Sequence, residues 1–290
     1  MIRLIEVGPR DGLQNEAITV PTADKVQFIN ALSESGVDEI EASAFVSPKW
    51  VPQLADANDV LAQIQRRPNV TYSALVPNEK GLDRALAANV DKIAVFTAAS
   101  EKFNRKNINA SVARSLVRFV PVIRRAKEAN LPIRGYVSTS FWCPYSGKIE
   151  PEAVVDVVQN LVDLGVDDIS IGDTIGKAVP EEVDALLEQI LPIVPAERLA
   201  MHFHNTYGHA VENVLRSYEL GIRAFDASVG GVGGCPYAPS SLGNVPTEQV
   251  VMALREAGEE VSVDLDKMAA AREILSGALG RLLHATSPLP

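Results

Sequence analysis

Leu164-Gly165-Val166-Asp167 joins the end of a predicted helix to the start of a predicted strand, and this junction decides the fold. Glycine is favoured after a helix because it adopts the left-handed backbone conformation at low cost. The same junction recurs in Glu34-Ser35-Gly36-Val37-Asp38 and in Leu220-Gly221-Ile222-Arg223. A repeated helix–glycine–strand junction predicts alternating strands and helices, as in α/β folds.

The alternation continues from one end of the 290-residue chain to the other. Short β-branched runs predict eight strands, at 2–7, 38–43, 70–76, 91–97, 133–139, 167–171, 199–203 and 223–229. Amphipathic stretches predict eight helices, at 22–35, 54–66, 79–88, 110–129, 150–164, 180–193, 207–220 and 246–257. Eight repeats predict a single TIM (β/α)8 barrel over 1–290.

The last residues, 266–290, extend this barrel, and 266–283 predict one or two helices packed beneath or across it. A doubly wound open sheet is the alternative. That fold usually has fewer repeats and carries a glycine-rich phosphate turn after its first strand, which the chain lacks.

Composition narrows the possible partners. The chain has 27 Lys and Arg against 37 Asp and Glu, a net charge of −10, which disfavours non-specific nucleic-acid binding. No run approaches the roughly 20 apolar residues that span a bilayer. Met1-Ile2-Arg3-Leu4 leads straight into the first strand, so we expect no targeting peptide and a cytoplasmic location. The two cysteines are expected to be free thiols.

Gly8-Pro9-Arg10-Asp11-Gly12-Leu13-Gln14 follows the first predicted strand. Its glycines and proline predict a turn that presents a guanidinium and a carboxylate where ligands bind parallel α/β proteins. Structural roles are equally open: Asp11 could cap the turn, and Arg10 could pair with Glu6 or Glu41.

Other polar residues lie at or just after the ends of predicted strands, namely Glu41, Asp173, His202, His204 and the glycine-rich stretch 230–237. In a barrel they all converge on the carboxyl-terminal mouth.

His202 and His204 are two residues apart on a strand, so both side chains point into the barrel. Two imidazoles and one carboxylate suit a divalent metal, and Asp11 is the carboxylate we expect there. A hydrogen-bonded histidine pair in the core is the alternative. Coordination completed by Asn244 or water would favour Mg²⁺ or Mn²⁺ over a structural zinc.

Cys235 lies in a glycine-rich loop, which predicts a mobile functional thiol. Cys143, also followed by Pro-Tyr, has no glycine run and serves as the matched comparison.

Taken together, these segments resemble the 3-hydroxy-3-methylglutaryl-CoA (HMG-CoA) lyase family over nearly the whole chain. The similar stretches are 8–16, 43–53, 106–109, 134–138, 143–145, 172–176, 233–238 and 243–244. The cysteine loop and Ser47-Pro48-Lys49-Trp50-Val51-Pro52 are specific to this branch; His-x-His and Arg-Asp-Gly are shared by a wider barrel group.

The resemblance implies Mg²⁺ or Mn²⁺ as cofactor, an acyl-CoA substrate and a homodimer. It also implies functional residues: metal ligands Asp11, His202, His204 and Asn244; a catalytic set of Arg10, Asp11, Glu41, Asp173, His202 and Cys235; substrate-binding Arg10, Gln14 and Glu41; and supporting Glu6 and Glu248.

Four residues depart from the family pattern in three places. Asn205 and Ala17 replace a common Asp and Lys, which could tune the surroundings of the metal or the mouth, and the bulky Phe141-Trp142 could reshape an acyl pocket.

The resemblance predicts cleavage of HMG-CoA to acetyl-CoA and acetoacetate, with Asp11, His202 and Asp173 as candidate bases. A longer branched 3-hydroxyglutaryl-CoA, a Claisen synthesis or an aldolase reaction are alternatives, and a metal-stabilised barrel that serves binding or assembly is a non-enzymatic one. Lys49, Lys102, Arg105 and Lys106, on predicted βα loops, are candidates for the CoA phosphates, although exposed basic residues are often only solvated.

Overall fold

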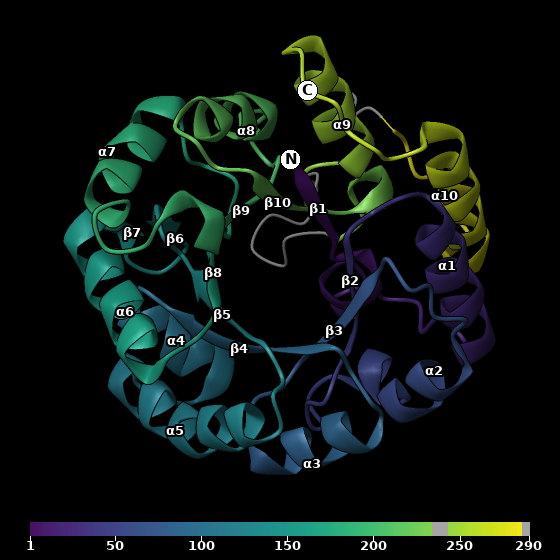
Figure 1. Cartoon of the computed structure of the whole chain (residues 1–290), viewed down its shortest axis with the longest axis horizontal. Coiled ribbons are helices and arrows are strands. Elements are labelled where there is room, and N and C mark those ends of the chain that lie inside the picture. The colour runs from purple at the N-terminus through teal and green to yellow at the C-terminus, as the bar shows by residue number, and fades with distance from the viewer. Residues whose placement is uncertain (234–242, 286–290) are drawn as a thin grey trace.

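Eight parallel strands close into a barrel in the computed structural model, which describes residues 1–233 and 243–285 (Figure 1). The strands follow one another around the barrel in chain order, and the first pairs with the last. Each overlaps a predicted range, so the predicted TIM barrel is confirmed. They are β1 (Arg3–Glu6), β2 (Glu39–Ala44), β3 (Thr71–Leu75), β4 (Lys92–Ala98), β5 (Ile133–Ser138), β8 (Asp168–Asp173), β9 (Leu199–Phe203) and β10 (Ala224–Ala227).

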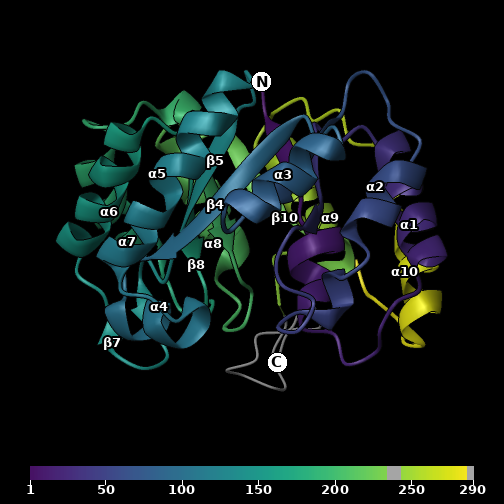
Figure 2. The same cartoon turned by 90° about the horizontal axis from the view of Figure 1, so that it is seen from below.

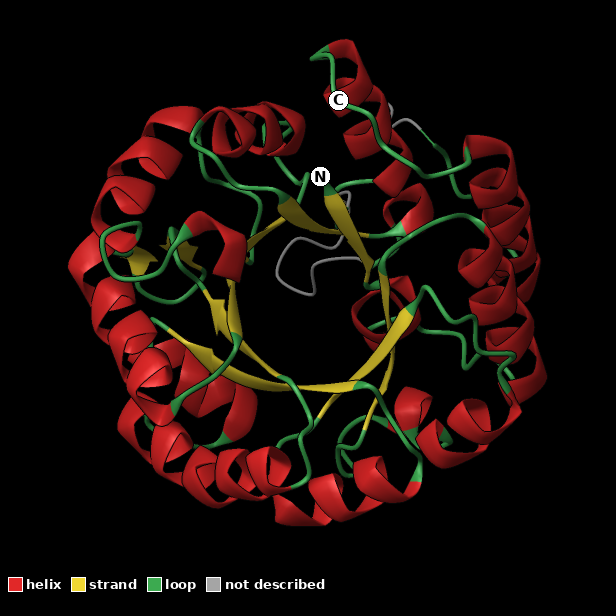
Figure 3. Cartoon of the chain, viewed as in Figure 1, coloured by secondary structure: helices red, strands yellow, loops and turns green. Residues whose placement is uncertain are grey.

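A ring of helices surrounds the barrel (Figure 3). The eight predicted helices are α1 (Thr22–Glu34), α2 (Ala57–Gln63), α3 (Glu79–Ala87), α5 (Val112–Glu128), α6 (Pro151–Leu164), α7 (Pro180–Ile190), α8 (Ala210–Glu219) and α9 (Thr247–Glu256). The junction glycines Gly36, Gly165 and Gly221 have φ of 85°, 87° and 97°, the left-handed conformation that the sequence predicted.

The sequence did not predict the helix α4 (Glu101–Ile108) or the hairpin β6 (Trp142–Cys143) and β7 (Gly147–Lys148). Phe103 and Ile108 are the only apolar residues of α4, so no apolar periodicity marks it. Ser100 caps its first turn by accepting the Phe103 N–H.

The C-terminal extension forms one helix in the described residues, α10 (Leu265–Leu279). It lies beside α1 in the outer layer, as both views show (Figures 1 and 2). The expectation that it packs beneath or across the barrel is therefore wrong, because Met268, Ala271 and Leu275 bury their side chains in the outer core instead. No helix of the described ranges is long and apolar enough to cross a membrane.

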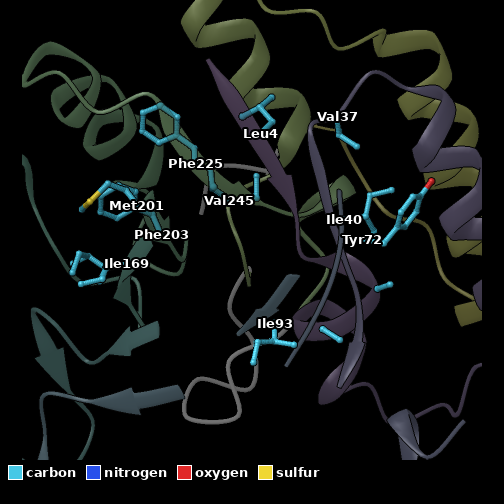
Figure 4. Packing of buried hydrophobic residues seen from close by; sticks show 14 of the residues in the cluster. Leu4, Val37, Ile40, Tyr72, Ile93, Ile169, Met201, Phe203, Phe225 and Val245 are labelled. Atoms are coloured by element: carbon cyan, nitrogen blue, oxygen red, sulfur yellow. The ribbon is translucent and has the colours of Figure 1, made fainter. Parts of the chain in front are cut away.

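Alternation along each strand separates an apolar outer face from the barrel lumen. In β9, Leu199, Met201 and Phe203 belong to the core between strands and helices, where Figure 4 labels the last two. His202 lies between them in sequence, and its side chain therefore faces the lumen. In Figure 2, β1 starts near the N-terminus at the top, so the carboxyl ends of the parallel strands lie at the lower edge.

The turn after β1 is a single π-helical turn, Gly8–Gly12, rather than an open loop. The Val7 carbonyl accepts hydrogen bonds from the N–H groups of residues 10, 11 and 12. A Cβ at Gly8 would lie 2.6 Å from Oε1 of Glu6, and one at Gly12 would lie 2.6 Å from Cγ1 of Val232. Both glycines are needed because the turn packs too closely for a side chain, and this turn fixes the backbone of Arg10 and Asp11.

Candidate active site

Three potential metal ligands gather at the carboxyl ends of β1 and β9. Asp11, His202 and His204 each place one ligand atom within 4.8 Å of the others. The two imidazole centroids are 5.2 Å apart, and Nε2 of His204 lies 4.0 Å from Oδ2 of Asp11. The fold thus brings together two residues near position 203 and one near the N-terminus, as the sequence analysis expected.

Asn244 lies against this cluster and forms an isolated bridge with His204. Its Nδ2 donates to Oδ2 of Asp11 and to the Val232 carbonyl, each at 3.0 Å. Its Oδ1 is buried and has no hydrogen-bond partner among the described residues. A buried oxygen of this kind costs free energy unless something binds it. Two imidazoles, a carboxylate and an unpaired amide oxygen are a donor set that fits a divalent cation.

The two histidines differ in their preference for a proton. Burial and the neighbouring His202 lower the pKa of His204 to about 4, so its ring is neutral at physiological pH and can donate a lone pair. Burial also acts against a charge on His202, but the nearby carboxylates of Asp226 and Asp11 outweigh it and raise the pKa of His202.

Arg10 is held between two carboxylates. Its Nε donates to Oε2 of Glu41 at 2.6 Å, and its Nη1 donates to Oδ1 of Asp11 at 2.7 Å. Of the two partners considered from the sequence, Glu41 is the one that pairs with it. The guanidinium carbon lies 5.4 Å from the ring centroid of Tyr136, a neighbour that the sequence analysis missed. Tyr136 lies on β5, two residues after Arg134 and inside the stretch 134–138 that resembles the family. That position is the sequence signal that could have identified it.

The surrounding charges keep both Arg10 and Asp11 ionised. Burial opposes ionisation of Asp11, but the positive charge of Arg10 and the two histidines hold its pKa well below the usual range. Burial likewise opposes the charge on Arg10, and Glu41 with Asp11 raises the Arg10 pKa above its ordinary value. Glu41 is fully buried, and its pKa is raised by that burial despite the adjacent guanidinium.

Asp173 faces away from the cluster. It stands in register with Phe203, whose side chain packs in the outer core. Its carboxylate accepts the backbone N–H groups of Lys177 at 3.2 Å and Ala178 at 2.9 Å. Burial raises the pKa of Asp173 to about 6, although these hydrogen bonds act against the rise. In the structure Asp173 anchors the turn after β8, and a Cβ on Gly176 of that turn would lie 2.6 Å from the His204 carbonyl oxygen.

Glu6 and Glu248 connect the π turn to the glycine segment that follows β10. Glu6 accepts the N–H groups of Gly8 at 2.9 Å and Val229 at 3.0 Å. Glu248 accepts the N–H of residue 230 at 3.0 Å and pairs with Arg272 of α10 at 2.6 Å. Both carboxylates therefore support the backbone around the cluster. Burial raises the pKa of Glu6 to about 8.

Gln14, the two cysteines and the basic CoA candidates are the remaining residues singled out from the sequence. Gln14 is half-buried just after the π turn. Cys235 lies outside the described residues. Cys143 is buried, and its sulfur accepts from the Ser100 hydroxyl at 3.0 Å. All four basic CoA candidates are exposed, and Lys49 lies in the loop after β2. Lys102, Arg105 and Lys106 lie, as expected, in the connection from β4 to α5, but this connection forms the helix α4 rather than an open loop.

Of the residues that depart from the family pattern, Phe141, Trp142 and Asn205 each contact another part of the chain. Phe141 packs in the core, with its ring centroid 6.4 Å from that of Phe203. Trp142 donates from Nε1 to Glu182 at 3.0 Å. These contacts hold both aromatic side chains in place. Asn205 accepts the Ala210 N–H at the start of α8, and Ala17 is exposed.

A TIM barrel with a histidine–carboxylate cluster and a paired arginine at its carboxyl edge defines a class: barrel enzymes with a candidate metal centre. The sequence profile described as HMGL-like matches residues 1–275. The chain belongs to this HMGL-like family.

Individual relatives agree over nearly the full length. The cytoplasmic 3-hydroxy-3-methylglutaryl-CoA lyase of Rattus norvegicus is 45% identical over 97% of this chain and 82% of its own. The 3-hydroxy-3-isohexenylglutaryl-CoA/hydroxy-methylglutaryl-CoA lyase of Pseudomonas aeruginosa is 46% identical over 97% of this chain and 93% of its own. The crystal structure of the HMG-CoA lyase from Brucella melitensis superposes with a TM-score of 0.94 at 50% identity, covering 96% of this chain and 99% of that chain.

Proposed function

We propose that this chain is a divalent-metal-dependent lyase that cleaves HMG-CoA to acetyl-CoA and acetoacetate. The observation that carries the proposal is the Arg10–Asp11 pair, which places a fixed cation directly beside a potential metal ligand. The reaction breaks the C2–C3 bond. The C3 hydroxyl loses its proton and becomes the ketone of acetoacetate, and the electron pair of the broken bond forms the enolate of acetyl-CoA.

The residues that would hold the ion are Asp11, His202, His204 and Asn244. When bound, a divalent ion orients the substrate and acidifies its hydroxyl. Oxygen donors from Asp11 and Asn244 favour Mg²⁺ or Mn²⁺. Asn244 contributes twice in this arrangement, since its amide nitrogen orients Asp11 while its unpaired oxygen stays available.

Arg10 would stabilise the enolate oxygen of the departing thioester. A fixed donor at a developing negative charge lowers the barrier most when it needs no reorganisation. Glu41 and Asp11 supply that rigidity by holding two guanidinium nitrogens. Arginine suits this position better than lysine, because its planar fork can pair with both carboxylates at once.

The substrate hydroxyl also needs a proton acceptor. Asp11 and His202 lie in the cluster and are the two candidates that its geometry supports. Asp173 is turned towards the backbone of residues 177 and 178, so we assign it the role of holding the turn against His204. Cys235 is the residue that the family resemblance pairs with proton exchange at the enolate carbon. It follows the described glycines Gly230, Gly231 and Gly233.

The choice of substrate has a second candidate. The Pseudomonas aeruginosa relative is named for a 3-hydroxy-3-isohexenylglutaryl-CoA as well as for the methyl compound, so a longer branched acyl-CoA is proposed as the alternative. We also propose a homodimer located in the cytoplasm, with Lys49 or the basic face of α4 meeting the CoA phosphates.

One assay tests the activity. The purified protein is incubated with HMG-CoA and Mg²⁺, and acetoacetate is followed with and without a chelator, beside a parallel reaction with the isohexenyl substrate. Chelator-sensitive acetoacetate formation is expected. If the metal-loaded protein forms no product from HMG-CoA and none from the isohexenyl substrate, the proposal is contradicted. Light scattering in solution tests the dimer.

A further inference from the structure

His202 has one side-chain neighbour on the strands beside it. Asp226 of β10 stands in register with His202 on one side, and Gly172 of β8 stands in register on the other. In-register residues of parallel strands point to the same face. Oδ2 of Asp226 lies 3.5 Å from Nδ1 of His202, and this buried nitrogen makes no hydrogen bond within the described residues.

Asp226 cannot turn freely, because both of its oxygens are already engaged. Oδ1 accepts from Nη1 of Arg134 at 2.9 Å, and Oδ2 accepts from the Ser170 hydroxyl at 2.7 Å. The carboxylate is fully buried, and Arg134 is 1% exposed. The oxygen that faces His202 is therefore fixed in place before any ligand binds.

Arg134 is fixed in turn by a buried ionic network in the lumen. It also pairs with Asp168 at 2.5 Å and lies 3.9 Å from Glu39. Lys92 joins the same two carboxylates, at 2.6 Å and 3.0 Å. Two cations thus hold three carboxylates, and Asp226 is the member of the network that contacts the metal cluster.

We propose that Asp226 is a positioning residue that accepts the Nδ1–H of His202 and so presents Nε2 to the ion. A histidine that ligates a metal commonly donates its other N–H to a carboxylate, which fixes the tautomer and the ring orientation. The inference rests on the metal site of the proposed function. Asp226 would explain why His202 is ready to bind a metal, because its carboxylate in the barrel interior selects the tautomer that leaves Nε2 free.

Asp226→Asn is a sharp test because the network determines the orientation of the new side-chain amide. Arg134 is a donor, so the amide oxygen must occupy the Oδ1 position, where it can accept the Arg134 N–H. The amide nitrogen then faces Ser170 and His202 and donates to Nδ1. We expect the proton of His202 to move to Nε2, which removes the lone pair meant for the metal.

The tautomer is read by ¹⁵N NMR of the metal-free chain at alkaline pH. The chain has four histidines, so substituting the others singly assigns His202. We expect the Nδ1–H tautomer in the native chain and the Nε2–H tautomer in Asp226→Asn. Mn²⁺ affinity, measured by titration calorimetry, should fall about 10–100-fold.

The matched control is Glu39→Gln, which removes one carboxylate charge from the same network but leaves Asp226 in place. It should lower the melting temperature while leaving the tautomer and the Mn²⁺ affinity unchanged. An Nε2–H tautomer in the native chain overturns the inference, and this result needs no variant to fold. An unchanged tautomer in folded Asp226→Asn also overturns it. Failure of the lyase assay would overturn the proposed function and leave the tautomer result standing.

Discussion

Arg10→Gln removes both tasks that the structure gives to this arginine, and a second variant tells them apart. In the folded chain the guanidinium is the counter-ion of the fully buried Glu41 and the neighbour of Asp11. In the proposed reaction it also stabilises the enolate oxygen. Glutamine keeps a polar side chain of moderate length but loses the charge and the fork, so both tasks fail together in this variant.

The magnitudes of the two losses differ. Removing one donor from a developing oxyanion lowers kcat by about 10²–10³, or about 2.7–4 kcal/mol of transition-state stabilisation. Removing one partner of a buried ion pair costs about 3–5 kcal/mol of stability. Glu41 is 0% exposed, so solvent cannot replace the lost partner, although uptake of a proton by the carboxyl group relieves part of the cost.

The double variant Arg10→Gln/Glu41→Gln is the control that distinguishes these effects. It removes the stranded carboxylate, so most of the lost stability should return while kcat stays low. Steady-state kinetics with HMG-CoA and Mg²⁺ measures kcat and KM, and urea unfolding measures stability. If folded Arg10→Gln turns over within about threefold of the native enzyme, Arg10 is not part of the chemistry and the assignment fails.

Three further predictions address other residues. Cys235→Ala should lower kcat without changing metal content, whereas Cys143→Ala, which removes a buried sulfur bonded to Ser100, should leave kcat unchanged; equal kcat values for the two variants would remove the special role of Cys235. Asp11→Asn should abolish the increase in melting temperature that Mn²⁺ gives the native chain, because one ligand charge is lost; a persistent increase would exclude Asp11 as a ligand. Glu6 has a pKa raised by burial from 4.5 to about 8, so the folded chain binds that proton more tightly than the unfolded chain, and stability should decline as pH rises across this window. Glu6→Gln can keep the hydrogen bonds to Gly8, Val229 and Thr247, so urea midpoints measured from acid to alkaline pH should vary less than in the native chain; an unchanged pH profile would contradict the assignment of that proton to Glu6.

The sequence by itself determined the architecture and most of the cluster. Left-handed glycines at 36, 165 and 221 and the alternating β-branched runs are local signals, which depend on a few neighbouring residues. The spacing of His202 and His204 is also local, since period-two alternation alone puts both on one face of a strand. Local signals failed at α4, where Phe103 and Ile108 are too few apolar residues to show a helical period.

Only the tertiary structure decided on which face Asp173 lies and which residues lie beside each polar side chain. Asp173 ends β8 and Glu41 lies within β2, but the register of Asp173 with Phe203 turns Asp173 away from the cluster. Asp226 reaches His202 because β9 and β10 pair at that register, across a helix that separates them in the chain. Arg134, Asp168 and Lys92 come from three more strands. Closure of the barrel brings these residues together, and because each contact depends on the relative shift of two strands, no short stretch of sequence encodes it.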